Sequence, residues 1–235
     1  MMPRTIAIGD IHGCKSALEK LLVEIQPKSD DTIVGIGDYV DRGMDSAGVL
    51  DLLLELVTRC RFVPLIGNHE LMMFQAINNG KRDFDFWYQH GGNTTLASYG
   101  GRIENIPQHH MTFLSHCLRF FETDTHFFIH ANYDPVVPLP EQDDTVQFWT
   151  HIKEFPPGPH LNGKTAIVGH TPQVDGNILD LGHVKIIDTF CYGDKFLTAL
   201  DVTTGDYWQA SNWGDFRSGR LDGSPPASNV PGLDE

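Results

Sequence analysis

Long apolar runs are missing from this sequence of 235 residues. No run approaches the ~20 apolar residues that a membrane-spanning helix needs. The first residues, Met1-Met2-Pro3-Arg4-Thr5, also lack the long apolar core and small-residue cleavage site of a secretory signal. These absences predict a cytoplasmic protein that has no membrane partner.

Cysteine is scarce, and its spacing excludes the usual cysteine-based sites. The four cysteines lie far apart and form no CxxC pair. This pattern indicates free thiols rather than a disulfide framework or a zinc cage. A nucleophilic thiol would have to be Cys14, which follows Gly13 in a glycine-rich turn. We interpret Cys14 as an inert apolar residue, as most free cysteines are.

Basic residues are also few, 17 against 31 acidic residues, which gives a formal net charge of −14. A protein held on nucleic acid by phosphate contacts needs a basic surface, so we expect no nucleic-acid partner. An enzyme that processes phosphate at this net charge would need bound cations in its site. The 12 histidines are compatible with such a site.

Strand-like and helix-like patterns alternate in the first third of the chain. They predict strands at 5–8, 32–36 and 61–66, separated by helices at 16–25 and 46–59. This βαβαβ order favours a parallel sheet.

The rest of the chain is predicted to contain a helical segment, then further strands, and finally a tail. Residues 71–125 are predicted to be a mainly helical cap insertion. Later strands, which predict a second sheet packed on the first, are expected at 126–129, 165–168, 184–187 and 196–200. We expect one domain over residues 1–217. Residues 218–235 are rich in Ser, Pro and Gly and are predicted to be a disordered tail.

Five predicted strands end in a turn that carries a polar side chain of metal-ligand type. Taken singly, each is an ordinary turn or a buried histidine, but together they indicate one site, because ligands bind beyond the carboxyl ends of parallel strands. Carboxylate and imidazole suit divalent Mn, Fe, Co and Zn, and two such ions can clamp a phosphoryl group. The nearby Arg42 offers a forked donor for phosphate oxygens. The candidate site residues are Asp10, His12, Asp38, Asn68, His69, His130 and His170.

Three motifs, in this order, resemble the signature of the phosphoprotein phosphatase family of the calcineurin-like metallophosphoesterases. They are Gly9-Asp10-Ile11-His12-Gly13, Gly37-Asp38-Tyr39-Val40-Asp41-Arg42-Gly43 and Gly67-Asn68-His69-Glu70. Trp87 to Gly100 resembles a cap segment of the bacterial and phage Ser/Thr phosphatases, and Gly169-His170-Thr171 resembles their last histidine motif. The resemblance covers residues 5 to 202. It implies an α/β fold of two packed mixed β-sheets flanked by helices, in α-β-β-α layers.

The resemblance also implies a dinuclear metal site. Two divalent ions are expected, with Mn as first choice and Fe, Zn, Co or Ni as alternatives. A hydroxide bridging the two ions would attack phosphorus directly. The first ion would be held by Asp10, His12 and Asp38, and the second by Asp38 as bridge with Asn68, His130 and His170.

The resemblance assigns the remaining site residues to the substrate side. His69 would act as the general acid, and Asp41 would orient it and stabilise its imidazolium. Arg42 would bind the phosphoryl oxygens. Glu70 could position its loop or be purely structural, and the sequence leaves both roles open.

Two departures from the family pattern stand out. Bacterial relatives often carry Trp-x-Arg before the last histidine motif, whereas this chain reads Phe148-Trp149-Thr150-His151. His151 therefore stands where a phosphate-binding arginine is expected, as a substitute donor or as an ordinary loop residue. In addition, the His130-Ala131 pair lacks the usual following glycine, which predicts a groove of different shape.

The sequence therefore predicts a metal-dependent phosphomonoesterase. Its expected partner is a phosphoserine or phosphothreonine protein or peptide, with phosphotyrosine or a small phosphomonoester also considered. One alternative is a dinucleoside tetraphosphate hydrolase, although that branch usually lacks the aspartate found here as Asp41. The other is a non-catalytic binding protein that retains the fold. The presence of every expected ligand and of His69 argues against it.

Overall fold

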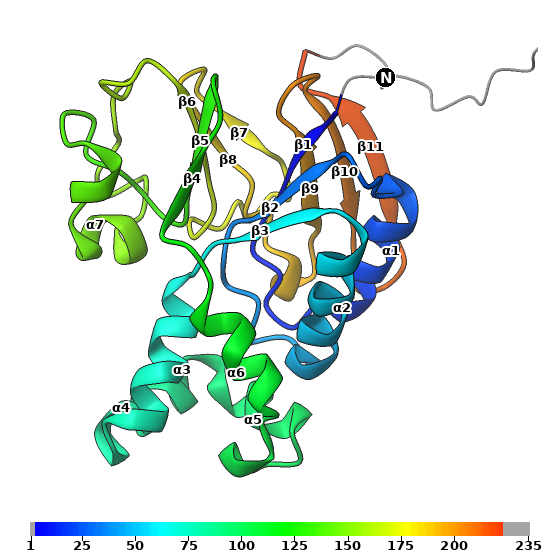
Figure 1. The fold of residues 1–235 in the computed structure, drawn as a ribbon, viewed down its shortest axis with the longest axis vertical. Coiled ribbons are helices and arrows are strands. Elements are labelled where there is room, and N and C mark those ends of the chain that lie inside the picture. Colours follow the sequence, from blue (N-terminus) through cyan, green and yellow to red (C-terminus); the bar gives the residue numbers. More distant parts are fainter. Residues whose placement is uncertain (1–2, 223–235) are drawn as a thin grey trace, which may run out of the picture.

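The computed structural model of the protein describes residues 3–222. Two β-sheets lie at its centre, and a group of helices, α3 to α6, gathers at one end of them (Figure 1). This arrangement matches the predicted fold of two packed mixed sheets flanked by helices.

The first sheet has six strands in the order β11-β10-β9-β1-β2-β3. Its β1, β2 and β3 are parallel, as the βαβαβ pattern predicts, and β9 joins β1 in antiparallel orientation. The strands of this sheet are β1 (Thr5–Ile8), β2 (Thr32–Gly35), β3 (Arg61–Pro64), β9 (Leu197–Asp201), β10 (Asp206–Ala210) and β11 (Phe216–Arg220).

The second sheet has five strands in the order β4-β5-β6-β8-β7. Its central strands β5, β6 and β8 are parallel, and the edge strands β4 and β7 are antiparallel to their neighbours. The strands are β4 (Phe120–Glu122), β5 (His126–Ile129), β6 (Thr165–Val168), β7 (Leu179–Asp180) and β8 (Val184–Ile186).

Side-chain alternation along β1 explains how the layers are held together. Ile6 and Ile8 pack under helices α1 (Lys15–Ile25) and α2 (Ser46–Arg59), whereas Ala7 points into a second core shared by the two sheets. Val34 of β2 and Phe128 of β5 both belong to that second core. Because successive strand residues face opposite sides, one short apolar strand serves both cores.

Helix α2 begins and ends where its sequence indicates. The Asp45 side chain accepts a hydrogen bond from the Gly48 amide at 2.8 Å, which caps the first turn. The buried residues Val49, Leu53 and Leu56 recur at helical spacing and place one face of α2 against the first sheet.

Between β3 and β4 the described chain forms only helices and short turns. They are α3 (Asn68–Asn78), α4 (Lys81–Trp87), a π-helical turn at Tyr88–Gly92, α5 (Asn93–Ser98), a 3-10 turn at Ile103–Asn105 and α6 (Gln108–Ser115). Further short elements follow at Leu139–Glu141, α7 (Asp144–Trp149) and Cys191–Gly193. None of the helices within residues 3–222 is long and apolar enough to cross a membrane.

The predicted boundary of the C-terminal tail differs from the structure. Residues 218–220, assigned to the tail, belong to the edge strand β11. This strand is polar, and Arg220 is tied to Asp206 of β10 by a hydrogen bond of 2.6 Å. A polar edge strand has no apolar periodicity, so the sequence pattern could not reveal it. The predicted tail at 223–235 lies outside the described residues.

Candidate active site

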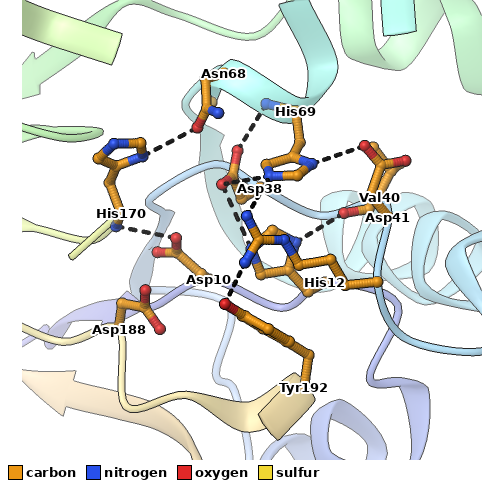
Figure 2. A network of polar contacts seen from close by, with 12 residues as sticks. Asp10, His12, Asp38, Val40, Asp41, Asn68, His69, His170, Asp188 and Tyr192 are labelled. Carbon is orange, nitrogen blue, oxygen red and sulfur yellow. Dashed lines mark hydrogen bonds and ion pairs between the residues drawn. The ribbon is translucent and has the colours of Figure 1, made fainter. Parts of the chain in front are cut away.

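The polar residues predicted at the strand ends converge at one edge of the two sheets. Figure 2 shows that they come together from segments far apart in the sequence. Asp10 follows β1, Asp38 follows β2, and Asn68 begins α3 after β3. From the second sheet, His130 follows β5 and His170 follows β6.

Two groups of possible metal ligands share Asp38. One contains His12, Asp38 and His69, and the other contains Asp38, His130 and His170. The ligand atoms of each group lie within 4.8 Å of one another. His12 Nε2 lies 3.5 Å from Asp38 Oδ2, and His130 Nε2 lies 3.5 Å from Asp38 Oδ1. A shared carboxylate between two imidazole groups is the arrangement that a bridging ligand requires.

Backbone carbonyls fix which nitrogen of each histidine carries its proton. His12 Nδ1 contacts Val40 O at 3.0 Å, and His130 Nδ1 contacts Ile36 O at 2.9 Å. His170 contacts Trp149 O through Nε2 at 3.2 Å. Since each carbonyl must receive a proton, the opposite ring nitrogen is left with a free lone pair.

The free lone pairs of these histidines point toward other hydrogen-bond acceptors of the site. With its amide oriented as it is, Asn68 places Oδ1 3.0 Å from His130 Nε2 and 3.0 Å from His170 Nδ1, so three acceptor atoms converge there. In addition, the buried Asp10 Oδ1 has no hydrogen-bond partner. A cation stabilises acceptors that face one another in a buried space. The donor set therefore fits divalent metal ions.

The electrostatics of the carboxylates point the same way. Burial, together with the charges of Asp188 and Asp38, raises the pKa of Asp10 well above its usual value. Burial and the charge of Asp38 likewise raise the pKa of Asp188 to about 7. Burial also acts to raise the pKa of Asp38, but the neighbouring His130 and His69 lower it overall. Crowded carboxylates repel one another, and a bound cation would relieve that repulsion.

His69 and Asp41 form a buried pair beside the ligand groups. His69 Nδ1 donates to Asp41 Oδ2 at 2.7 Å. Asp41 also accepts from Trp87 Nε1 at 2.9 Å and from Thr95 Oγ1 at 2.7 Å. Burial would lower the pKa of His69, but Asp38 and the hydrogen bond to Asp41 raise it. The sequence suggested the pair itself but not its supports Trp87 and Thr95, which reach it from the helical segment.

Arg42 and His151 line the pocket next to these groups. The pocket has a volume of about 440 Å³ and is also lined by Asp38, His69 and Asp188. Arg42 lies over the ring of Tyr192, with Cζ 4.5 Å from the ring centroid, and its Nη1 contacts the Tyr192 hydroxyl.

The His151 ring stacks on the ring of the predicted ligand His170, with centroids 4.5 Å apart. The structure thus brings Arg42 and His151 into one pocket. Tyr192 was missed, because a tyrosine in the short 3-10 turn at Cys191–Gly193 has no local signature.

Asp188 was also missed, although its signal was present. It follows the predicted strand at 184–187 directly, just as His130 directly follows the predicted strand at 126–129. It is 2% exposed, and its Oδ1 accepts from the Phe190 amide at 3.1 Å. Figure 2 shows it beside Asp10 at the edge of the site.

Glu70 positions its loop, which is one of the two roles that the sequence left open. Its carboxylate accepts from the amides of Asp38 at 2.9 Å, Tyr39 at 2.8 Å and Gly67 at 2.9 Å. It therefore fixes the turn that carries Asp38 against the start of α3.

The backbone of the site is strained. Five site residues that are not glycine adopt positive φ angles, a conformation that costs L-residues roughly 1–2 kcal/mol each. They are His12 (46°), Asp38 (51°), Asp41 (72°), Arg42 (67°) and His170 (59°).

A family model described as calcineurin-like phosphoesterase matches residues 3–187. The chain belongs to this family. Calcineurin-like phosphoesterases are hydrolases of phosphoric esters, and the metal-ligand groups of this chain agree with that chemistry.

Curated relatives of this phosphoesterase carry two kinds of name. Serine/threonine-protein phosphatase 2 of Salmonella typhimurium is 37% identical over 86 residues, 36% of this chain and 37% of that protein. The chain thus matches little more than a third of the length of that relative. The asymmetrical bis(5'-nucleosyl)-tetraphosphatase PrpE of Oceanobacillus iheyensis is 27% identical over 224 residues, 82% of this chain and 86% of that protein.

Among solved structures, the phosphoesterase is similar to a crystal structure of a proposed diadenosine tetraphosphatase. The TM-score is 0.65 at 22% sequence identity, and the match covers 94% of each chain. At this identity the likeness supports the fold alone.

Proposed function

We propose that this phosphoesterase is a phosphomonoesterase that dephosphorylates phosphoserine and phosphothreonine in proteins or peptides, and also phosphotyrosine. Two divalent ions, Mn²⁺ by preference, would be held by Asp10, His12 and Asp38 and by Asp38, Asn68, His130 and His170. When bound, the ions would polarise the phosphoryl oxygens and activate water.

The buried pair of His69 and Asp41 carries this proposal. A serine or threonine alkoxide is a poor leaving group, so its departure needs a proton. His69 lines the pocket, and the hydrogen bond of 2.7 Å from its Nδ1 to Asp41 stabilises the protonated ring. When a phosphoanhydride bond is cleaved, the leaving group is a stable phosphate anion, which has much less need of a proton from such an acid. The pair is thus better matched to monoesters than to polyphosphates.

Arg42 completes the substrate side of the proposal. In the described state, Arg42 Nη2 lies 3.1 Å from His69 Nε2, which must accept a hydrogen bond from this permanent donor. A phosphate group in the pocket would draw the guanidinium to its own oxygens and free His69 Nε2 to carry the proton. Stacking on Tyr192 holds the guanidinium plane in place for this contact.

The second candidate is a dinucleoside tetraphosphate hydrolase. Its support is the relative from Oceanobacillus iheyensis, which matches this chain over most of both lengths. The charge of the pocket argues against this candidate. Among the described residues that line the pocket, Arg42 is the only arginine or lysine, and the buried Asp188 lines it as well. A tetraphosphate chain has about twice the charge of a monoester, so it requires more cationic side chains.

Turnover across a substrate panel separates these candidates. The purified protein, loaded with Mn²⁺, would be given phosphoserine, phosphothreonine and phosphotyrosine peptides and diadenosine tetraphosphate at equal concentrations. We expect kcat/KM for at least one of the phosphopeptides to be at least about tenfold higher than kcat/KM for diadenosine tetraphosphate. Faster cleavage of diadenosine tetraphosphate would replace our proposal with the second candidate. Bound metal without turnover on any substrate would favour a binding protein.

A further inference from the structure

A second group of metal-ligand side chains lies outside the active site, between helices α2 and α6. It consists of Asp51 on α2 and His109 and His110 on α6, and the possible ligand atoms lie within 4.8 Å of one another. This group shares no residue with the active site. We propose that Asp51, His109 and His110 form an additional metal site that binds Zn²⁺ and clamps α6 of the helical segment to α2.

His110 is the fixed member of this group. It is 2% exposed, and its ring is held at both nitrogens. Nδ1 lies 2.7 Å from the Tyr99 hydroxyl, and Nε2 lies 2.9 Å from Asp51 Oδ1. A ligand histidine whose second nitrogen is held by a polar neighbour is the usual arrangement at protein metal sites.

The other two members can move to complete the site. Asp51 is 68% exposed, and His109 is also exposed. The His109 ring packs on His110 with centroids 4.5 Å apart, and no hydrogen bond within residues 3–222 occupies its nitrogens. Rotation of exposed side chains can therefore bring the ligand atoms from the observed separation to the ~3.4 Å between tetrahedral zinc ligands.

The chemistry of the group suits zinc. Two imidazoles and one carboxylate form a common zinc ligand set that leaves one position for water. Burial lowers the pKa of His110, so its ring is neutral at pH 7 and offers a lone pair. On binding, the ring proton would shift from Nε2, which faces Asp51, to Nδ1, where the Tyr99 oxygen accepts it. The ion would then bind His110 at Nε2, in the place of that proton. Because the proton stays on the ring at Nδ1, His110 would release no proton.

A bound ion here would join two parts of the fold. Asp51 belongs to a helix that packs on the first sheet, whereas His109 and His110 belong to the helical segment between β3 and β4. Ser46, at the start of the same α2 helix, accepts a hydrogen bond from the Asp41 amide at 3.1 Å. The ion would thus link α6 to the helix that supports the catalytic pair, and it would stabilise the folded chain by mass action.

Zinc stoichiometry tests this site directly. Full-length wild type, Asp51→Asn, His109→Ala and His116→Ala would be dialysed to equilibrium against the same Zn²⁺ concentration, and zinc per chain measured by mass spectrometry. His116→Ala is the matched control, because it removes an exposed imidazole from just beyond α6 that lies outside the group. Asp51→Asn keeps an oxygen that accepts from His110, so it preserves the fold.

We expect wild type and His116→Ala to bind one zinc ion more per chain than Asp51→Asn and His109→Ala. Zn²⁺ should also raise the unfolding temperature of wild type above the rise seen in Asp51→Asn. Equal stoichiometry in wild type and Asp51→Asn would overturn the proposal. An equal loss in His116→Ala would do the same, because it would indicate nonspecific binding to surface histidines.

Discussion

Replacing Asp41 with Asn perturbs the proposed catalytic pair of His69 and Asp41 while leaving every proposed metal ligand in place. The Asp41 carboxylate is fully buried and accepts from His69 at 2.7 Å, Thr95 at 2.7 Å and Trp87 at 2.9 Å. An amide that keeps its oxygen toward Trp87 and Thr95 turns its NH₂ toward His69 Nδ1. The ring proton then moves to Nε2, and the ring loses the charge that stabilised its protonated form.

The expected loss of rate in Asp41→Asn follows from the hydrogen bond between His69 Nδ1 and residue 41, whose direction is reversed. A hydrogen bond to a buried charged group contributes about 1.5–3 kcal/mol. At 1.36 kcal/mol per factor of ten, the upper value corresponds to about a 10²-fold loss of rate. This loss applies only where His69 donates a proton to the leaving group. An activated aryl phosphate, whose phenolate leaves without a proton, should lose less than about tenfold.

The assay compares kcat/KM for an alkyl phosphate and an activated aryl phosphate in wild type and Asp41→Asn, with bound metal measured in both. Asp45→Asn is the matched control, because it makes the same substitution four residues away at the cap of α2, where Asn caps equally well. An equal loss on both substrates with metal content intact would refute the acid role of His69. Loss of metal from Asp41→Asn would refute the assignment of Asp41 to the substrate side.

Three further predictions concern other parts of the structure. In Gly67→Ala the added Cβ would lie 2.1 Å from Asp38 Oδ1, so we expect reduced metal content and a loss of about 1–3 kcal/mol in unfolding free energy. Gly158→Ala, with no atom within 4 Å of its Cβ, is the control, and equal metal content in both would contradict the argument. His151→Arg should lower KM for a phosphopeptide about tenfold by adding a charged donor to the pocket, and an unchanged KM would place His151 away from phosphate. Burial acts to raise the pKa of Asp31, but its hydrogen bonds with Arg4 lower it below the usual value. The stabilisation by Asp31 is therefore present above pH ~4 and lost as the pH falls through the lowered pKa. Urea unfolding should show Asp31→Asn less stable than wild type at pH 7, with a difference that shrinks progressively as the pH falls below ~4. A difference that stays constant with pH would be the contrary result.

The sequence predicted those parts of the molecule that repeat a local pattern. The three parallel strands of the first sheet and the ends that carry Asp10 and Asp38 follow from apolar runs that stop at glycine and a polar residue. The strand β10 was missed because the polar Asp206 and Gln209 are among its buried residues, so apolar and polar residues do not alternate along it. The strand β11 was missed because it is mostly polar and no residue of it is fully buried. The short edge strand β7 has two residues, too few for any pattern.

In the site, too, residues within a local motif could be predicted from the sequence, and residues brought together by tertiary packing could not. His12 and Asn68 could be identified because their motifs are local and ordered along the chain. Trp87 and Thr95 lie 46 and 54 residues after Asp41, and only the packing of the helical segment brings them to its carboxylate. Contacts of this kind depend on tertiary structure, so they leave no mark in a short stretch of sequence.

The left-handed backbone at His12, Asp38, Asp41, Arg42 and His170 has a consequence for protein engineering. Loops grafted onto an unrelated scaffold would relax to ordinary dihedral angles, because nothing there would hold these residues in strained conformations. In this chain the turn at Asp38 is held by the Glu70 carboxylate, which is buried at the start of α3. A designer who wished to transplant this catalytic centre would have to move both sheets and α3 with it, since the motifs alone do not encode its shape.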